Sequence, residues 1–358
     1  MKKLFLSLVA AIVAATATFA QGSLLATLSH DGHISAFYGA EALRTAMAEA
    51  EAGDVITLSS GQFNAVDIDK PITLRGAGMS NSSDSISSHE PTIIQNSFTI
   101  NIADSLSSRL LMEGIYFKSG INYQGTIKNA QFMKCRFLNF IANSEARIVN
   151  SSFIHCRFYN GFTMNNNSSN AYFINSIICS PRNSVSSGTN TSNIEFDNCV
   201  VKFDYSSNYG SNPAYIQNGY YKNCIILKIN GNSGCIIPWS CTAYNCVGYN
   251  RVSNENLFAN MSSQNTTNVT VTSLSGLFKT YSQTNHGTFI SDIDDFTLTD
   301  KAAAKYLGTD GTQVGIFGGS LPYDEEPTIP QITKCNVASK STADGKLSVD
   351  IEVKAAEY

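Results

Sequence analysis

The chain has 358 residues, of which 43% are hydrophobic and only 15% are charged, and its formal net charge is -4. Soluble domains average about 25% charged residues, so the composition excludes a charge-rich disordered chain and a coiled coil. The 25 Gly and 16 Tyr residues, together with abundant Asn and Ser, favour extended β structure. A negative net charge provides no basic field to neutralise phosphates, which argues against nucleic acid as a partner.

Residues 1–20 have the pattern of a secretory signal, with two early lysines, an apolar run over residues 4–13 and small residues up to Ala20. We predict cleavage near Ala20, with Ala17 as the competing site. A transmembrane anchor needs about 20 continuous apolar residues, and this run is shorter and has no successor. The mature protein is therefore predicted to be secreted, periplasmic or at the cell surface, without a transmembrane segment.

A six-fold repeat occupies the middle of the chain. Each copy has an aromatic residue, or Ala in the last copy, three positions before a Cys or Ser. Those Cys or Ser positions are Cys135, Cys156, Ser176, Cys199, Cys224 and Cys246, spaced by 21, 20, 23, 25 and 22 residues. Gly114 fits as an earlier copy. A steady period of roughly 20–25 residues without helical periodicity predicts one β-solenoid coil per copy.

The residue just before the Cys or Ser is predicted to be a turn residue. Strict β alternation would place the aromatic residue and the Cys on opposite faces, so the chain must bend between them. Four copies have Asn at this point, which tolerates left-handed backbone geometry: Asn175, Asn198, Asn223 and Asn245. We predict that these amides are structural and that they hydrogen-bond to one another and to the backbone along the solenoid axis.

Both ends of the solenoid carry their own signals. Residues 39–53 predict a capping helix, with Leu43 and Met47 on one face and Gly53 as the C-cap. After an acidic linker at 322–327, two alternating runs joined at Asp344-Gly345 predict a C-terminal β hairpin. The predicted organisation is a signal peptide over residues 1–20, a solenoid over residues 21–320, and the linker with its hairpin over residues 321–358.

The repeat rows and two terminal stretches together resemble the right-handed parallel β-helix of the pectin-lyase-like superfamily, in the form common among exported proteins of Bacteroidetes. The terminal stretches include Asp54-Val-Ile-Thr-Leu58, Pro71-Ile-Thr-Leu-Arg-Gly-Ala-Gly78 and the Gly-rich run from Gly308 to Gly319. This resemblance implies an all-β, right-handed parallel β-helix over roughly residues 40–320. It implies no single activity, because the same fold hosts lyases, hydrolases, adhesins and inert scaffolds.

The nine cysteines are predicted to be mostly buried thiols. Five of them share the repeat position and are expected to form one inward structural file: Cys135, Cys156, Cys199, Cys224 and Cys246. Stacked neighbours in register rarely reach disulfide geometry, and a parallel row does not converge on a metal. Cys235 and Cys241 are the best disulfide pair if one exists.

The resemblance implies where a lyase site would lie. Acidic-polysaccharide lyases of this fold generally use a Lys or Arg base, often beside calcium held by carboxylates. The one carboxylate cluster of the coils is Glu195, Asp197 and Asp204, with Lys222, Lys202 and Arg182 within about one coil. In the interpretation that we favour, charges such as Asp197 and Lys222 pair across adjacent coils as solvated surface residues.

Binding without turnover is the preferred functional prediction. Aromatic residues beside amides suit sugar faces, and the candidates are Tyr159, Tyr205 and Tyr220. Arg136 and Arg157 share an outward repeat position and are candidates for an anion contact. The carboxylate motifs of the fold's glycoside hydrolases do not occur in the coils.

We therefore predict a glycan-associated, non-catalytic binding or structural module. The alternatives are a lyase acting on uronate-containing polysaccharides and an adhesin-like component that recognises protein. The expected partner is a polysaccharide or cell-surface glycan. No motif demands a cofactor, and calcium enters only with the lyase alternative. The oligomeric state stays open.

Overall fold

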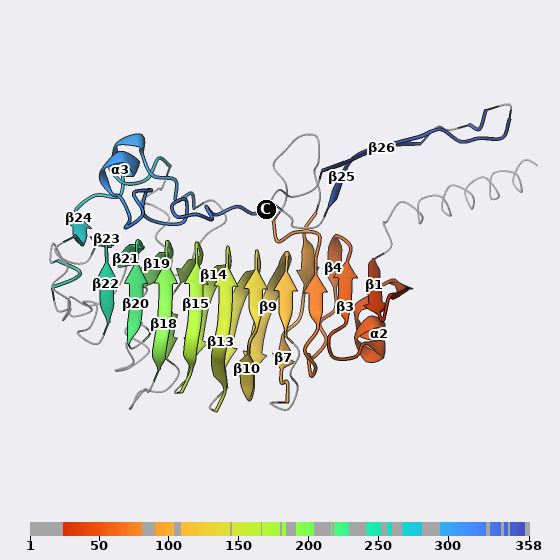
Figure 1. The fold of residues 1–358 in the computed structure, drawn as a ribbon, viewed down its shortest axis with the longest axis horizontal. Coiled ribbons are helices and arrows are strands. Elements are labelled where there is room, and N and C mark those ends of the chain that lie inside the picture. Colours follow the sequence, from red (N-terminus) through yellow and green to blue (C-terminus); the bar gives the residue numbers. More distant parts are fainter. Residues whose placement is uncertain are drawn as a thin grey trace, which may run out of the picture.

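The chain folds as a parallel β-solenoid (Figure 1). The computed structural model describes residues 24–80, 90–103, 109–143, 145–165, 167–179, 181–183, 191–203, 216, 218–228, 241–251, 256–259, 267–280, 294–326, 330–337, 340–342 and 344–354. Within these residues the strands form two 12-stranded sheets and one two-stranded hairpin. The predicted all-β solenoid is confirmed.

Sheet A begins with an antiparallel hairpin and continues as a parallel stack. In spatial order its strands are β2 (His33–Tyr38), β1 (Leu25–His30), β3 (Val55–Leu58), β5 (Thr73–Arg75), β8 (Leu111–Glu113), β11 (Gln131–Met133), β13 (Arg147–Ile154), β15 (Ser169–Ile174), β18 (Ser192–Asp197), β20 (Gly219–Lys222) and β22 (Thr242–Tyr244), with β10 (Thr126–Lys128) beside β13.

Sheet B is the parallel partner of sheet A, and each coil contributes strands to both. In spatial order its strands are β4 (Gly61–Phe63), β6 (Thr92–Ile94), β9 (Ile115–Tyr123), β12 (Arg136–Ala142), β14 (Arg157–Met164), β16 (Ile177–Cys179), β19 (Val200–Phe203), β21 (Ile225–Lys228), β23 (Val247–Asn250) and β24 (Val269–Val271), with β7 (Phe98–Ile100) beside β9 and β17 (Pro181–Asn183) beside β14.

The repeat places like residues directly above one another, and its aromatic position forms the central column of the core. Its members from sheet A are Phe132, Phe153, Phe173, Phe196 and Tyr221, which pair in register from coil to coil. Successive ring centroids are 4.7–4.8 Å apart and the rings lie within 12° of parallel. The spacing matches the distance between neighbouring strands, so one unchanging register stacks every ring.

The bend after the aromatic residue has left-handed backbone geometry, as predicted. The residue before the Cys or Ser has a positive φ in every copy: Lys134 49°, His155 52°, Asn175 43°, Asn198 52°, Asn223 55° and Asn245 51°. Gly114 also has a positive φ, of 66°. Since Met133 pairs with Glu113, Gly114 is the equivalent of the turn residue Lys134, whereas the repeat spacing had predicted that it is the equivalent of Cys135. This conformation turns the chain from sheet A into sheet B, so that the aromatic residue and the thiol both face inward.

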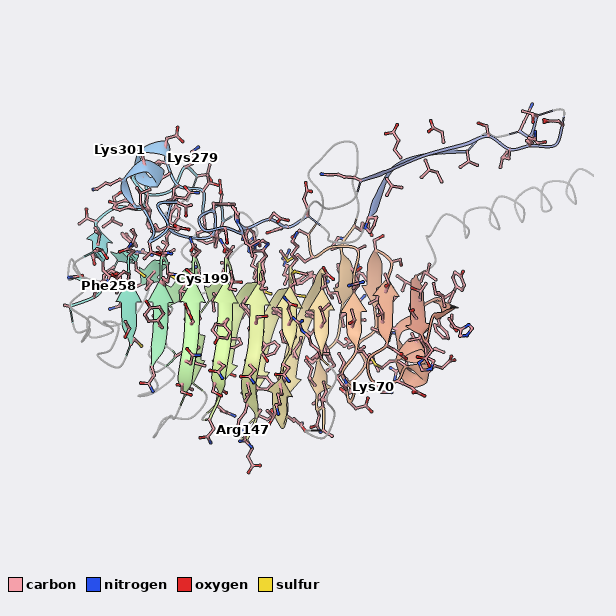
Figure 2. The ribbon with its side chains drawn as sticks, viewed as in Figure 1. Lys70, Arg147, Cys199, Phe258, Lys279 and Lys301 are labelled. Carbon is pink, nitrogen blue, oxygen red and sulfur yellow. The ribbon has the colours of Figure 1, made fainter. Side chains whose placement is uncertain are left out.

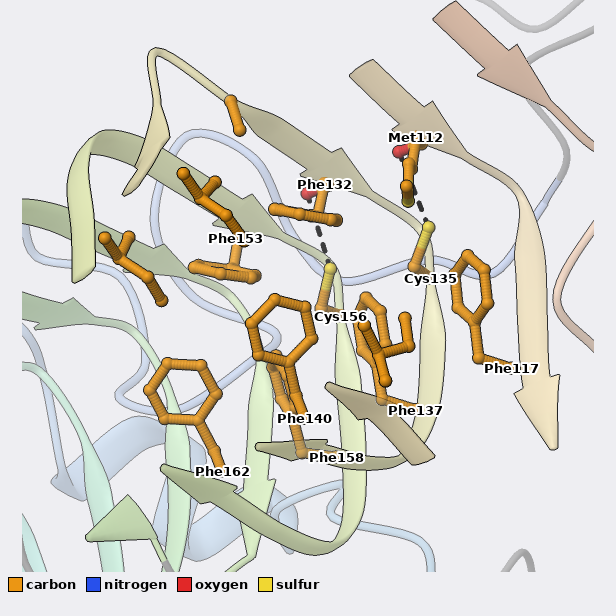
Figure 3. Close-up of a cluster of buried hydrophobic side chains, with 14 of the residues drawn as sticks. Met112, Phe117, Phe132, Cys135, Phe137, Phe140, Phe153, Cys156, Phe158 and Phe162 are labelled. Carbon is orange, nitrogen blue, oxygen red and sulfur yellow. Dashed lines mark hydrogen bonds between the residues drawn. The ribbon is translucent and has the colours of Figure 1, made fainter. Parts of the chain in front are cut away.

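The five thiols of the repeat file are buried and free, which confirms the prediction for them. Each one also reaches back one coil to a carbonyl; for example, the Cys156 Sγ lies 3.4 Å from the Phe132 oxygen (Figure 3). Ser176 makes the same contact with the Phe153 oxygen at 3.2 Å. The repeat therefore needs a small side chain with a hydrogen to donate, which explains why Ser can replace Cys.

Burial keeps four of these thiols protonated. Desolvation raises the pKa of Cys135 to about 12, and it raises that of Cys156, Cys224 and Cys246 well above the usual value. These four thiols are accordingly poor nucleophiles and poor metal ligands.

The predicted capping helix is present as α2 (Ala42–Glu49), whose buried face includes Leu43 and Met47. It ends earlier than predicted, with Ala50 rather than Gly53 as the C-cap. Lys70, from the following coil, donates to the Met47 and Ala50 oxygens and so satisfies carbonyls at the helix end.

The chain after β24 returns over the solenoid. This C-terminal segment, residues 272–280 and 294–326, contains α3 (Asp300–Lys305) and runs along one edge of the strand row (Figure 1). Figure 2 shows Lys279 and Lys301 on it, and Arg147 at the opposite ends of the strands. The predicted hairpin follows as β25 (Gln331–Val337) and β26 (Val349–Lys354) and stands away from the body.

The aromatic column predicts a strong effect of Phe153→Ala. Its ring is fully buried and stacks at 4.8 Å on both Phe132 and Phe173. Its loss should lower the free energy of unfolding by about 3–5 kcal/mol, measured by urea denaturation with far-UV circular dichroism. Ser152→Ala, on the outer face of the same strand, is the control and should change it by less than about 0.5 kcal/mol. If Phe153→Ala and Ser152→Ala had the same midpoint of urea denaturation, the claim that the aromatic column stabilises the fold would be contradicted.

Candidate functional site

The C-terminal segment covers the outer face of sheet B from β16 to β23. Outward residues of these strands pack with the segment in a second apolar cluster, whose members include Ile177, Val200, Ile225 and Leu227 from the sheet and Leu277, Phe278 and Ile316 from the segment. Any candidate residue that projects outward from this part of sheet B is consequently beneath another layer of the protein.

Lys202 is one of these covered residues. It shares a register position with Cys179 and Leu227, which both belong to the second apolar cluster, and its exposed fraction is 0%. A base that attacks a polysaccharide must reach solvent-accessible substrate, so this geometry disfavours Lys202 as a lyase base. Sequence reasoning missed the burial because the covering residues come more than 70 positions later in the chain.

The two arginines proposed for anion contact are engaged within the protein. The Arg136 guanidinium lies between two rings, 4.1 Å from the Tyr116 centroid and 4.4 Å from that of Tyr159. Arg157 is buried and forms an ion pair of 3.3 Å with Glu325. Tyr159 is itself only 7% exposed. Arg157 therefore joins the solenoid to its own C-terminal segment, and Arg157 and Tyr159 offer little surface to a ligand. Arg136 is half-buried and stacks on rings of the solenoid itself.

The turn residues at the sheet A to sheet B corner hold the last part of the C-terminal segment, residues 309–326, which we call the strap. The Asn175 amide donates to the Ile316 and Gly318 oxygens at 2.7 and 2.8 Å, and the Gly315 amide donates to the Asn223 oxygen at 2.8 Å. Of the four side-chain amides predicted to bond along their own row, those of Asn175, Asn198 and Asn223 bond mainly to the strap, although Asn223 also donates to Asn198 at 3.3 Å. The Asn245 Oδ1 is buried without a hydrogen-bond partner among the described residues.

The strap can approach this closely because it is rich in glycine. A Cβ on Gly318 would lie 2.6 Å from Asn198 Nδ2, and one on Gly315 would lie 2.5 Å from the Ile225 side chain. The stretch expected to be a linker also belongs to the strap, since Tyr323 is buried and Asp324 pairs with Lys134 at 2.6 Å.

The outer face of sheet A carries the remaining candidates. Register aligns Tyr172, Glu195 and Tyr220 in one outward column on β15, β18 and β20. The neighbouring column contains Asp197, Lys222 and Tyr244 on β18, β20 and β22. We call these six residues the tyrosine face.

All six residues of the tyrosine face are partly or well exposed, and Tyr244 reaches 42%. Strand spacing puts the Tyr172 and Tyr220 positions about 10 Å apart with Glu195 between them. The result is a flat surface with aromatic side chains, a carboxylate and an ammonium group.

A second asparagine row borders this face. It lies six residues before the Cys or Ser in the first five copies of the repeat, and every member has left-handed geometry: Asn129, Asn150, Asn170, Asn193 and Asn218. Here the amides do form a ladder, because Asn193 donates to Asn170 and Asn170 donates to Asn150, each at 2.8 Å. Asn193 also donates to the Tyr172 hydroxyl at 3.0 Å. The constant offset of six residues was the sequence signal that could have revealed this row.

Asp197 and Lys222 form the cross-coil pair of our favoured interpretation, with 3.0 Å between Lys222 Nζ and Asp197 Oδ2. The hydrogen bond with Asp197 raises the pKa of Lys222. A general base must be unprotonated near the working pH, so this pairing works against Lys222 as a proton acceptor. Burial, and then the neighbouring Glu195, raises the pKa of Tyr220, which likewise stays protonated.

The other predicted site residues are less informative. Asp204, Tyr205 and Cys235 lie outside the described residues, and Arg182 is described only as part of β17. Cys241 is buried and its Sγ lies 3.3 Å from the Ile216 oxygen. Glu195 and Asp197 are two positions apart on one strand, which leaves the proposed calcium cluster incomplete without Asp204.

The described ranges lack a metal-binding cluster and a membrane-spanning helix. These ranges contain no group of three or more His, Cys, Asp or Glu residues arranged to hold a metal ion. They also contain no helix whose length and apolar character would let it cross a membrane. Compared with family models, with curated proteins and with solved structures, the chain matches none of them.

The strap predicts a pH-dependent stability through His155. Its Nε2 donates to the Leu321 oxygen at 3.0 Å, its Nδ1 lies 3.7 Å from Asp324, and Lys134 is also near. Burial lowers the pKa of His155 below 6.5. Below pH 6.5 the unfolded chain takes up a proton that the folded chain resists, so stability should fall as the pH drops from 7 to 5.

His155→Asn tests this effect, because Asn occupies the same turn position in four other copies. We expect the variant to lose less stability than the wild type between pH 7 and pH 5 in urea denaturation. His33→Asn, which changes an exposed histidine, should leave the wild-type difference unchanged. An equal pH response of wild type and His155→Asn would contradict a role for His155.

Proposed function

We propose that this chain is an exported, non-catalytic glycan-binding or surface structural module, and that the tyrosine face is its glycan-binding surface. The supporting observation is the alignment of Tyr172 and Tyr220 on either side of Glu195, on an outward column of sheet A. Flat aromatic rings stack on the apolar faces of sugars, while carboxylates and amides accept or donate hydrogen bonds to hydroxyls. The amide ladder ending at Tyr172 extends the polar part of this surface.

The repeat architecture suits an extended ligand. Each coil presents the next member of a column one strand spacing further along, so a glycan chain lying parallel to the solenoid axis meets Tyr172, Glu195 and Tyr220 in succession. The signal-like residues 1–20 support export. The resemblance to pectin-lyase-like β-helices of Bacteroidetes supports a role with polysaccharides outside the cytoplasmic membrane.

The ion pair and the raised pKa of Lys222 favour binding over a lyase activity. Its ammonium group is paired with Asp197 and its pKa is raised, so neither proton abstraction nor neutralisation of a substrate carboxylate is readily available to it. The uncompensated charge on the tyrosine face is that of Glu195, since Asp197 and Lys222 cancel. Neutral or amine-bearing glycans are therefore expected to bind better than uronate-rich ones.

The test is a binding panel of neutral, amine-bearing and uronate-containing polysaccharides, measured by affinity electrophoresis and calorimetry. Tyr172→Ala and Tyr220→Ala should each weaken binding by about tenfold, the equivalent of about 1.4 kcal/mol. Gln131→Ala is the control, because it lies on the same outward column two strands toward the N-terminus. Equal affinities of all three variants would refute the proposed face.

The same panel, supplied with calcium, separates the alternatives by ultraviolet absorbance of unsaturated products. A rise that Lys222→Ala abolishes would establish a polysaccharide lyase. Neither binding nor product formation with any glycan would favour recognition of a protein instead.

A further inference from the structure

The C-terminal hairpin exposes an apolar stripe. On β26, Val349, Ile351 and Val353 are 50%, 51% and 58% exposed, and they alternate with charged residues such as Asp350 and Glu352. Alternation of this kind is typical of a strand with one face against a core. The described residues of the protein provide no core for β26 to contact.

The register of the hairpin pairs each residue of the β26 stripe with a position on β25. Val353 is paired with Ile332, Ile351 with Cys335, and Val349 with Val337. An isolated two-stranded hairpin is marginally stable in water and gains independent stability from a third strand or a packing partner. This hairpin therefore has both a face and strand edges suited to association.

A second open surface lies at the N-terminal end of the solenoid. In the described residues β2 pairs only with β1, so it forms the edge of sheet A. Ile34 and Tyr38 on β2 are 74% and 67% exposed. Proteins usually protect such edges with Pro, Lys or a bulge, yet β2 contains none of these in its pairing with β1. The helix α2 packs on the apolar interior of this end and leaves the edge itself open.

The two surfaces match in length and pattern. Both β2 and β26 have six residues. The outward alternate positions of β2 are Ile34, Ala36 and Tyr38, and β26 likewise has three apolar alternate positions. Figure 1 shows the hairpin extending past β1, toward and beyond the end of the solenoid that carries β2.

We propose that two copies of this chain associate through their N-terminal ends, with β26 of each copy adding as a strand to the open edge of β2 of the other. Strand addition satisfies backbone groups on both edges and extends sheet A. It places one three-residue apolar stripe beside the other, so that neighbouring apolar side chains contact each other across the new strand pair. Because each copy gives one strand and accepts one, the contact is self-complementary and closes as a two-fold dimer.

Charge favours this pairing over one between two hairpins. The strand β2 contains no Asp, Glu, Lys or Arg residue. Asp350 and Glu352 thus meet no like charge in β2. Antiparallel pairing of two β26 strands would instead bring these carboxylates of both copies together, which is destabilising.

The oligomeric state of the full chain tests the proposal. Size-exclusion chromatography with light scattering should give twice the monomer mass at micromolar concentrations. Ile351→Lys and Ile34→Lys, which both change well-exposed side chains, should each give monomers. The matched controls are Ser348→Lys, beside the stripe but on the other face, and Glu49→Lys, on the exposed side of α2; both should stay dimeric.

Amide hydrogen exchange then identifies the partner of β2. Residues 33–38 should exchange more slowly in the wild type than in Ile351→Lys, because the change is on β26 while the readout is on β2. A monomeric wild type would overturn the proposal, as would assemblies larger than a dimer. Loss of the dimer in Ile351→Lys with a persistent dimer in Ile34→Lys would also overturn it, since the hairpins would then pair with each other.

Discussion

One backbone constraint organises this protein: the left-handed turn between the inward aromatic residue and the inward Cys or Ser of each coil. A continuous strand would send these two side chains to opposite faces. The turn at Asn175 and its equivalents brings both into the core. The same corner lets each thiol or hydroxyl contact a carbonyl of the preceding coil, as Ser176 does with Phe153. Coil geometry, core stacking and the file of thiols are therefore consequences of a single repeated conformation.

The second organising feature is the C-terminal segment, which makes the two sheets unequal. It covers the outer face of sheet B and is held at the corner by Asn175, His155 and Lys134. Sheet A keeps a face of partly exposed side chains, including Tyr172 and Tyr220. The C-terminal segment thus covers one face of the solenoid, while side chains on the outer face of sheet A stay partly exposed.

The two proposed surfaces are compatible because they lie at different places along the solenoid. The tyrosine face belongs to strands β15 to β22, whereas the open edge is β2 at the N-terminal end. Two copies joined at β2 would carry their tyrosine faces on separate arms. Two linked binding faces raise the effective affinity for a long or surface-bound glycan without any new contact.

Sequence alone determined the period, the inward aromatic and thiol positions, the turn residues, the capping helix and the terminal hairpin. These are local or periodic features, and a constant spacing forces equivalent residues into columns. The sequence alone could not decide which distant segments of the chain pack against each column. Lys202 is buried by residues that lie more than 70 positions later in the chain. Asn175 donates a hydrogen bond to Ile316, which lies more than 140 positions later. The alignment of Tyr172 and Tyr220 on either side of Glu195 could be recognised only from the register between coils. Distant packing and register follow from the whole folded chain, and so only the tertiary structure separated covered candidates from accessible ones.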